Sequence, residues 1–390
     1  MLERPQIKGR GTAAHSPLPI RRVDAIPVAL PLKSPMKMSG ITIATAENLL
    51  VRIEAANGRV GWGEAASAPT MTGETVESMT AAVHYLTPAV EGREAEDIAG
   101  TCAAMAGRMY GNSAAKAAIE MAVHDLVGRA TNRPAYALLG EKRRSRIALL
   151  GVISNGELAG DLRDAEKKKA DGFEAFKIKV GIDKPLIDGE RTRQVCRLLG
   201  PGLLISSDAN QGWSPEEAVQ YARAVTGCGL DFFEQPVLAD DIAGMAAVAA
   251  AADFAIGADE SIHSLEDIRR HHERKAARGV SLKTIKLGGM RGVTAAGLLC
   301  EQLGMAVNVS CKTGESSLAG AAGLHIAAAL PQMSWGLTLS HEGLADDVTA
   351  RPIRVERGHV EVSDRPGLGI DVDEDRVRRY RRDMPVRQVA

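Results

Sequence analysis

Two lysines lie two positions apart in a short apolar segment, Phe176-Lys177-Ile178-Lys179-Val180. Side chains alternate between the faces of a β-strand, so a strand here would point Lys177 and Lys179 to the same side. Two neighbouring ammonium groups are costly to bury unless an anion lies opposite or one amine is neutral. A lysine with a lowered pKa is a usable base, so the pair is a candidate for proton transfer. The alternative is an edge strand whose lysines face water.

Acidic residues follow three later apolar runs, at intervals close to one strand–helix repeat. Asp208, Glu234 and Asp259 each come directly after such a run, and Lys283 lies in the next one. If the runs are neighbouring parallel strands of a barrel, their C-terminal ends meet on one face, where barrel enzymes place their chemistry. The spacing therefore predicts three carboxylates in succession with a lysine on each side.

Three converging carboxylates cannot all stay ionised unless a cation lies between them. Oxygen ligands with room for water and substrate suit Mg²⁺, and Mn²⁺ is the nearest alternative. No cluster of histidines or cysteines in the sequence indicates zinc. A metal ion between two amines can stabilise an enediolate while a lysine removes the proton next to a carboxylate. The alternative is three acids in separate surface ion pairs.

The composition restricts the partners of such a site. The chain has 390 residues, long enough for two domains, and 48 basic residues balance 49 acidic ones. This balance argues against nucleic acid or an anionic membrane surface as the main partner. No apolar run is long enough to span a membrane, the N-terminus lacks a signal-peptide core, and the five cysteines show no paired spacing. We therefore expect a cytoplasmic protein with reduced thiols.

Residues 1–19 are polar and aperiodic, and we predict a loose tail there. Residues 20–146 combine strand-like runs, a hairpin signal at Asn57-Gly58 and three helical patterns, which predict an α+β domain. Two segments of this domain, 31–40 and 65–73, carry Pro, Ser, Met and Gly. We expect both to be loops that close over a ligand.

Residues 147–351 alternate short apolar runs with helical patterns. This alternation predicts a (β/α)7β-type TIM barrel, an α/β fold. A doubly wound open sheet is the alternative, but no glycine-rich phosphate loop follows the first strand. Residues 352–390 return to strand-like material, and we expect them to complete the capping domain formed by residues 20–146. The predicted barrel strands cover 147–152, 175–180, 203–207, 230–233, 254–258, 282–285, 305–309 and, more weakly, 333–336.

Taken together, these motifs resemble those of the enolase superfamily, in particular the muconate lactonizing enzyme subgroup of the mandelate racemase/muconate lactonizing enzyme family. The resemblance covers nearly the whole chain. It implies a TIM barrel with an α+β cap, with Asp208, Glu234 and Asp259 as metal ligands. It also implies that Lys179 and Lys283 are the acid/base pair. The matching motifs are Lys177-Ile178-Lys179, Asp208-Ala209-Asn210-Gln211-Gly212-Trp213, Glu234-Gln235-Pro236, Ala258-Asp259-Glu260-Ser261 and Leu282-Lys283-Thr284-Ile285-Lys286-Leu287-Gly288-Gly289.

The same resemblance gives Lys177 the role of tuning the pKa of Lys179. Lys283 is chosen over Lys286 because it has the family's offset before Gly288-Gly289. On a regular strand, Lys286 would also face the other way, since three is an odd step.

Four further residues are candidates for supporting or contacting the site. Asn210 and Glu260 are expected to hold the metal ligands in place from behind. Glu315 resembles an acidic residue that the family carries after strand seven, with a charge at a helix N-terminus as the alternative. Lys37, in the first capping loop, is a candidate for contacting a substrate carboxylate, with an exposed loop lysine as the alternative.

The resemblance implies a metal-dependent isomerase or lyase that takes the α-proton of a small carboxylate through an enediolate. Muconate-type cycloisomerisation is the first expectation, while racemisation or epimerisation of amino-acid derivatives and dehydration would use the same metal and lysines. We also expect a homo-oligomer. Two other classes stay open: a Schiff-base aldolase with a single reacting lysine, and a binding protein on the same scaffold.

Overall fold

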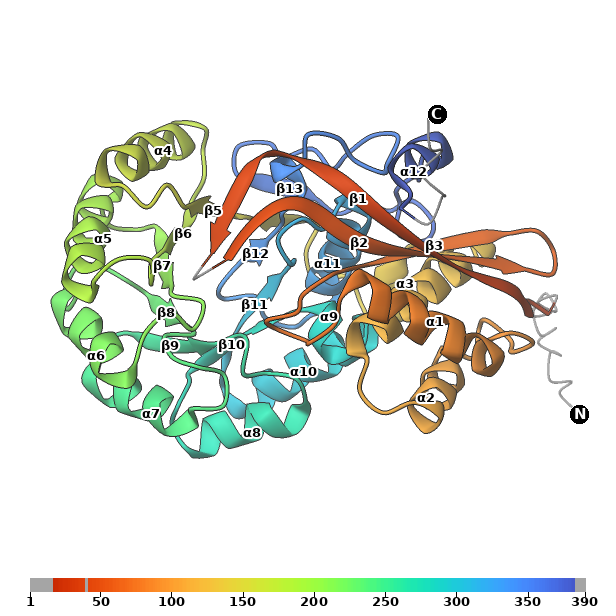
Figure 1. The fold of residues 1–390 in the computed structure, drawn as a ribbon, viewed down its shortest axis with the longest axis horizontal. Coiled ribbons are helices and arrows are strands. Elements are labelled where there is room, and N and C mark those ends of the chain that lie inside the picture. The colour runs from red at the N-terminus through yellow and green to blue at the C-terminus, as the bar shows by residue number, and fades with distance from the viewer. Residues whose placement is uncertain (1–16, 39–40, 383–390) are drawn as a thin grey trace, which may run out of the picture.

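The structure is a computed structural model that describes residues 17–38 and 41–382 (Figure 1). Most of the predicted tail, residues 1–16, lies outside the described residues. Its last part is packed rather than loose, because Leu18 is buried and its backbone N–H donates to Glu94 Oε2 at 2.7 Å. Within the described ranges, no helix has both the length and the apolar character needed to cross a bilayer.

The N-terminal part is a three-stranded antiparallel sheet covered by three helices. The sheet has the order β1-β2-β3, and the turn at Asn57-Gly58 joins β2 to β3, as predicted. Gly58 has a φ of +81°, a value that glycine adopts without strain. The elements are β1 (Ile20–Met38), β2 (Ile41–Ala55), β3 (Val60–Ala66), α1 (Val76–Val90), α2 (Ile98–Arg108) and α3 (Ser113–Ala130).

The first capping loop was predicted wrongly, because residues 31–38 continue β1 and pair with β2 as far as Met38 and Ile41. The register shifts between Pro31 and Met36. Proline cannot donate to a strand ladder, so the composition that indicated a loop produces an irregularity within a long hairpin instead. The second segment behaves as expected: β3 ends at Ala66, and residues 67–73 form turns.

The second part is a barrel of eight parallel strands in the order β5 to β12. A parallel bridge between Leu149 and Leu337 joins its first and last edges, so the open-sheet alternative is excluded. Helices α4 to α8 form an outer arc around the strands (Figure 1). The barrel strands are β5 (Leu150–Ile153), β6 (Ala175–Lys179), β7 (Leu204–Asp208), β8 (Phe232–Glu234), β9 (Ala255–Ala258), β10 (Gly279–Leu282), β11 (Ala306–Ser310) and β12 (Leu337–Thr338).

The helical patterns between the predicted strands are confirmed as helices, whereas three predicted strands differ in position. Of the first predicted strand, 147–152, residues 147 and 148 belong to a strand outside the barrel, and the barrel strand begins at Leu150. The helices are α4 (Leu158–Ala170), α5 (Pro185–Leu199), α6 (Pro215–Ala224), α7 (Ile242–Ala251), α8 (Leu265–Glu273), α9 (Thr284–Leu287), α10 (Met290–Leu303) and α11 (Ser317–Ala329). The apolar run 282–285, predicted as a strand, is instead the end of β10 and the start of the short helix α9. A short buried apolar run has no periodicity that separates the two structures. The last strand, predicted at 333–336, begins at Leu337.

The C-terminal segment contacts residues at both ends of the N-terminal part. Strand β13 (His359–Glu361) pairs with β4 (Arg146–Ala148), and helix α12 (Glu374–Tyr380) follows. The backbone N–H of Arg382 then donates to the carbonyl of Pro27 in β1 at 3.0 Å. The cap is therefore built from both ends of the chain.

Two buried glutamates of the cap hold the N-termini of barrel helices. Glu120, on α3, accepts the backbone N–H groups of Met290 and Arg291 at 2.8 and 2.9 Å, at the start of α10. Glu64, on β3, accepts those of Ser316 and Ala319 at the start of α11, both at 3.0 Å. Helix N-termini carry unsatisfied N–H groups and partial positive charge, so these carboxylates fix the cap on the barrel.

Candidate active site

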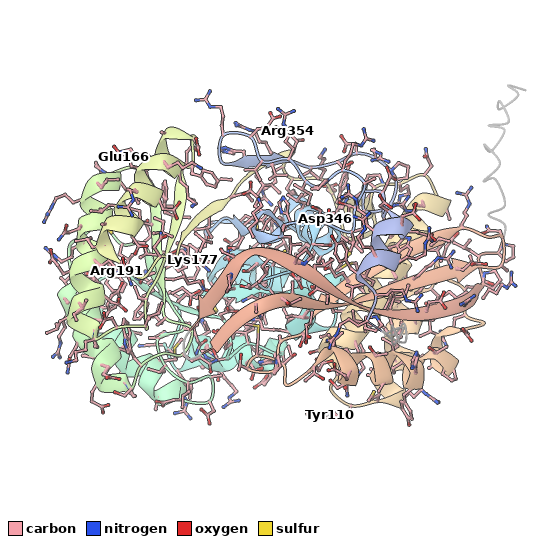
Figure 2. The ribbon with its side chains drawn as sticks, turned by 45° about the horizontal axis from the view of Figure 1, so that its top comes forward. Tyr110, Glu166, Lys177, Arg191, Asp346 and Arg354 are labelled. Carbon is pink, nitrogen blue, oxygen red and sulfur yellow. The ribbon has the colours of Figure 1, made fainter. Side chains whose placement is uncertain are left out.

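The strand register places the predicted charged residues side by side at one end of the barrel. Lys179 of β6 is paired with Asp208 of β7, and Asp208 with Glu234 of β8. Asp259 follows directly on β9. The three carboxylates are buried, with exposed fractions of 2%, 1% and 1%. Figure 2 shows Lys177, on β6, among the barrel strands, far from Tyr110 at the outer edge of the cap.

Each carboxylate is paired with a lysine. Lys177 Nζ lies 2.9 and 2.7 Å from the two carboxylate oxygens of Glu234. Lys179 Nζ lies 2.6 Å from Asp208 Oδ2, and Lys177 Nζ lies 3.8 Å from the same oxygen. Both lysines of β6 therefore project to the same side.

On the far side of the carboxylates, Lys283 Nζ lies 2.5 Å from Asp259 Oδ1. Lysines thus flank the acidic residues from β6 and from the end of β10.

Burial and charge act in opposite directions on the pKa values of this cluster. Burial raises the pKa of Glu234, Asp208 and Asp259 add to the rise by repulsion, and Lys177 opposes it. Burial would also raise the pKa of Asp208, but Lys179 and Lys177 hold it below its usual value. Burial would lower the pKa of Lys283, but Asp259 raises it. In this arrangement Lys283 is a cation, so it becomes a base only after it separates from Asp259.

Lys286 was predicted to face away from the site, and this is wrong. Its ammonium lies 2.6 Å from Asp259 Oδ1 and 2.9 Å from the carbonyl of Ser281, and it also donates to the carbonyl of Asp259. The alternation argument fails because the strand ends at Leu282 and Lys286 lies on helix α9. The side chain is 1% exposed and holds Asp259 from behind.

Replacing Lys286 with methionine is expected to lower the free energy of unfolding by about 3 kcal/mol, because two backbone carbonyls and a buried carboxylate lose a donor. Urea unfolding at pH 7 measures this change. Lys167→Met, at an exposed position of α4, is the matched control. Since Lys286 is assigned a supporting role, its loss should reduce α-proton exchange less than about 10-fold; a loss as large as that from a missing acid/base group would contradict the assignment.

Asn210 contacts Lys179 of β6 and Asp208 of β7, and Glu260 contacts Asn210. Asn210 Oδ1 accepts from Lys179 Nζ at 2.6 Å, and its Nδ2 donates to Glu260 Oε1 at 3.0 Å. The backbone N–H of Asn210 donates to Asp208 Oδ1 at 3.0 Å. Burial, with repulsion from Asp259 and Asp208, raises the pKa of Glu260 to about 7. The geometry thus connects both residues to the charged cluster.

Two supporting residues were not singled out from the sequence. Ser281 Oγ donates to Glu234 Oε2 at 2.9 Å. Ser281 lies two positions before Lys283, and this spacing could have indicated from the sequence that both side chains share one face of a strand. Gln235 Oε1 accepts from the backbone N–H of Asp259 at 2.9 Å, with its own φ at +34°. It lies within the Glu-Gln-Pro motif, but nothing in the motif alone shows that contact.

The two remaining candidates have different outcomes. Glu315 is buried behind Lys312, whose backbone N–H donates to Glu315 Oε2 at 2.9 Å. It directly precedes Ser316, the N-cap of α11, and burial raises its pKa to about 7. Glu315 is thus next to the site through Lys312. The side chain of Lys37 lies outside the described residues.

A cavity of about 320 Å³ opens over the charged cluster. This volume is at the small end of the range for ligand sites, so it suits a small molecule. Met71, from the second capping loop, contributes to its wall, as predicted for that segment. The charged and polar lining includes Lys177, Lys179, Asp208, Asn210, Glu234, Asp259, Lys283, Lys312 and Glu342.

Within residues 17–38 and 41–382, no three His, Cys, Asp or Glu side chains are arranged to surround a metal ion. Asp208, Glu234 and Asp259 are instead neutralised by ammonium groups. The donor set is nevertheless oxygen only, and Asp208 and Asp259 both repel Glu234. Such donors fit a hard divalent cation, provided that Lys179 and Lys283 separate from their carboxylates.

Both halves of the chain match known family models. Residues 20–140 match the N-terminal domain of mandelate racemase/muconate lactonizing enzyme, and residues 161–376 match the enolase C-terminal domain-like model. The chain is 33% identical to the L-Ala-D/L-Glu epimerase of Bacillus subtilis over 362 residues, which cover 90% of this chain and 96% of that one.

Two solved structures are closely similar. The muconate lactonizing enzyme of Pseudomonas fluorescens, complexed with muconolactone, has a TM-score of 0.89 at 28% identity, covering 94% of this chain and all of that one. The dipeptide epimerase of Cytophaga hutchinsonii, complexed with Mg and the dipeptide D-Ala-L-Val, has a TM-score of 0.87 at 29% identity, covering 93% and 98%.

Proposed function

Because the chain belongs to the mandelate racemase/muconate lactonizing enzyme family of the enolase superfamily, a family of cycloisomerases, racemases and epimerases, we propose that it moves the α-proton of a small carboxylate with a divalent metal ion. The observation that carries the proposal is the order of charges around the barrel. Three buried carboxylates on successive strands lie between Lys179 on one side and Lys283 on the other.

Asp208, Glu234 and Asp259 would hold the metal ion, Mg²⁺ or Mn²⁺. Their oxygen-only chemistry, burial and mutual repulsion support this assignment. The presence of magnesium in the structure of the similar dipeptide epimerase also supports a divalent metal ion at this site. When bound, the ion would neutralise the charge that develops on the substrate carboxylate as an enediolate forms.

The chain's own lysines would move the proton. Once separated from Asp208 and Asp259, one lysine acts as a neutral base on one side of the substrate, and the other as an ammonium acid on the opposite side. Lys177 stays paired with Glu234 as a fixed cation beside Lys179. Asn210 keeps the Lys179 ammonium in position through its 2.6 Å contact.

Two lysines that reach one cavity from different strands favour racemisation or epimerisation, because one can take the proton and the other return it. We therefore place 1,1-proton transfer ahead of the cycloisomerisation first expected from the motifs. Muconate cycloisomerisation is the second candidate, supported by the 0.89 TM-score to a muconate lactonizing enzyme. Dehydration would use the same groups, with a leaving group on the β-carbon.

Solvent deuterium exchange tests the proposal. The protein is incubated in D₂O with Mg²⁺ and a panel of carboxylates: muconates, dipeptides, N-acyl amino acids, hydroxyprolines and sugar acids. We expect metal-dependent replacement of the α-proton by deuterium, read by NMR and mass, with inversion for a racemase or epimerase. Formation of a lactone from muconate, with no inversion at the α-carbon of the other carboxylates, would favour the second candidate. Imine trapping by borohydride with metal-independent turnover would instead support a Schiff-base enzyme and contradict the proposal.

A further inference from the structure

A further lysine faces the cavity from outside the proton-transfer pair. Lys312 follows β11 and lines the cavity together with Lys179 and Lys283. Only 4% of its surface is exposed. Burial, together with the neighbouring ammonium groups of Lys283 and Lys179, lowers the pKa of Lys312 to about 8. It is thus a buried cation close to both reacting lysines at neutral pH.

In the described part of the chain, the ammonium group of Lys312 forms no direct ion pair with a carboxylate. Lys177, Lys179, Lys283 and Lys286 each pair with a carboxylate. No such ion pair is formed by Lys312 within these residues: Glu315 and Glu260 attract its charge from farther away, and Glu342 lines the same cavity. A buried ammonium without a direct ion pair is incompletely compensated, so a negative charge on a ligand would be favourable at this side of the cavity.

Lys312 is also held in a defined position. Its backbone N–H donates to Glu315 Oε2 at 2.9 Å, and its carbonyl accepts from Ser340 Oγ at 2.8 Å. Lys312 follows β11, which β10 separates from β9 and from the neighbouring strands β8 and β7, where the three carboxylates lie at the strand ends. A group bound by Lys312 is therefore distinct from the carboxylate that would react beside Asp208, Glu234 and Asp259.

We propose that Lys312 binds a second anionic group of the substrate, so that the substrate is a small acid with a second carboxylate separated from the reacting α-carbon. The assignment rests on the proposed function, since it takes the reacting carboxylate to lie beside the strand-end acids. Dicarboxylic acids, N-acyl amino acids that end in a carboxylate and dipeptides with an acidic residue meet this requirement. Lys312 would then determine specificity without moving a proton.

Matched ligand pairs that differ only in the second charge test the assignment. Suitable pairs are the dipeptides L-Ala-L-Glu and L-Ala-L-Gln, N-succinyl- and N-butanoyl-L-alanine, and cis,cis-muconate and its monoamide. Binding is measured by calorimetry in Mg²⁺, with α-proton exchange in parallel. In at least one pair the wild-type protein should bind the doubly charged member about 30-fold more tightly, as expected for a charge-assisted hydrogen bond.

Lys312→Met should remove this discrimination by weakening only the doubly charged ligand, Lys312→Arg should preserve it, and Lys167→Met is the surface control. Lys312→Gln serves if the methionine variant does not fold. Equal binding of both members of every pair by the wild-type protein would overturn the assignment. So would a loss of α-proton exchange with both members in Lys312→Met, because it would place Lys312 in proton transfer. Exchange by the wild-type protein tests the proposed function separately.

Discussion

Replacing either Lys179 or Lys283 with methionine is expected to lower racemisation or epimerisation about 1,000-fold, within the range that general acid–base groups contribute. Each variant should nevertheless still exchange the α-proton of one stereoisomer with solvent. The reason is that the lysines approach the cavity from β6 and from the end of β10, so each would serve one side of the α-carbon. Exchange of each stereoisomer in D₂O, followed by NMR, measures the two half-reactions.

The structure offers a reason for both variants to fold. Without Lys283, Asp259 keeps Lys286 as a partner at 2.6 Å, and without Lys179, Asp208 keeps Lys177 at 3.8 Å. Urea unfolding checks this, and Lys167→Met controls for loss of a surface lysine. If both variants lose exchange of both stereoisomers equally, the two-sided mechanism is wrong, and a single-base reaction such as cycloisomerisation becomes the better account.

Removal of divalent metal is expected to have the other large effect. Chelation with EDTA should abolish turnover, and Mg²⁺ or Mn²⁺ should restore it, since three buried carboxylates would otherwise remain paired with lysines. A metal that binds only the folded protein also stabilises it, by about 2.7 kcal/mol at 100 times its Kd. Thermal unfolding with and without Mg²⁺ measures this stabilisation independently of turnover.

Glu234→Gln should lose the metal-dependent stabilisation. It should also be less stable without metal by about 3 kcal/mol, because Lys177 is then buried without its anion. Glu266→Gln, at an exposed position of α8, is the matched control. Turnover that survives exhaustive chelation, or an unfolding temperature that does not respond to Mg²⁺ or Mn²⁺, would contradict the assignment of these carboxylates.

The sequence located the charged cluster because parallel strands put their C-terminal ends together. Asp208, Glu234 and Asp259 follow apolar runs directly, so one residue per repeat was enough to bring them to one place. Lys286 was misplaced because the same reasoning assumed a continuing strand, where the chain turns into a helix after Leu282. Alternation predicts which way a side chain points only for residues within the strand itself.

Other features depend on contacts that no local pattern carries. Lys312 looks like an ordinary loop lysine in the sequence, but it is buried, and its carbonyl accepts a hydrogen bond from Ser340, which is 28 positions away. Within the hairpin of β1 and β2, residues 31–40 were predicted as a loop because their prolines and serines have turn composition, whereas β1 continues to Met38. There, tertiary pairing outweighs local propensity.

The two glutamates that cap barrel helices from the N-terminal part have a consequence for the order in which the chain assembles. Glu64 is separated from Ser316 by 252 positions, and Glu120 from Met290 by 170. During synthesis, the ribosome releases both carboxylates long before their partner N–H groups exist. The early-made cap must therefore keep both acids hydrated and its docking face open until the last barrel helices emerge. Final burial of these acids must wait until the partner helices have been made, and chain termination before residue 319 would leave Glu64 without one of its N–H donors.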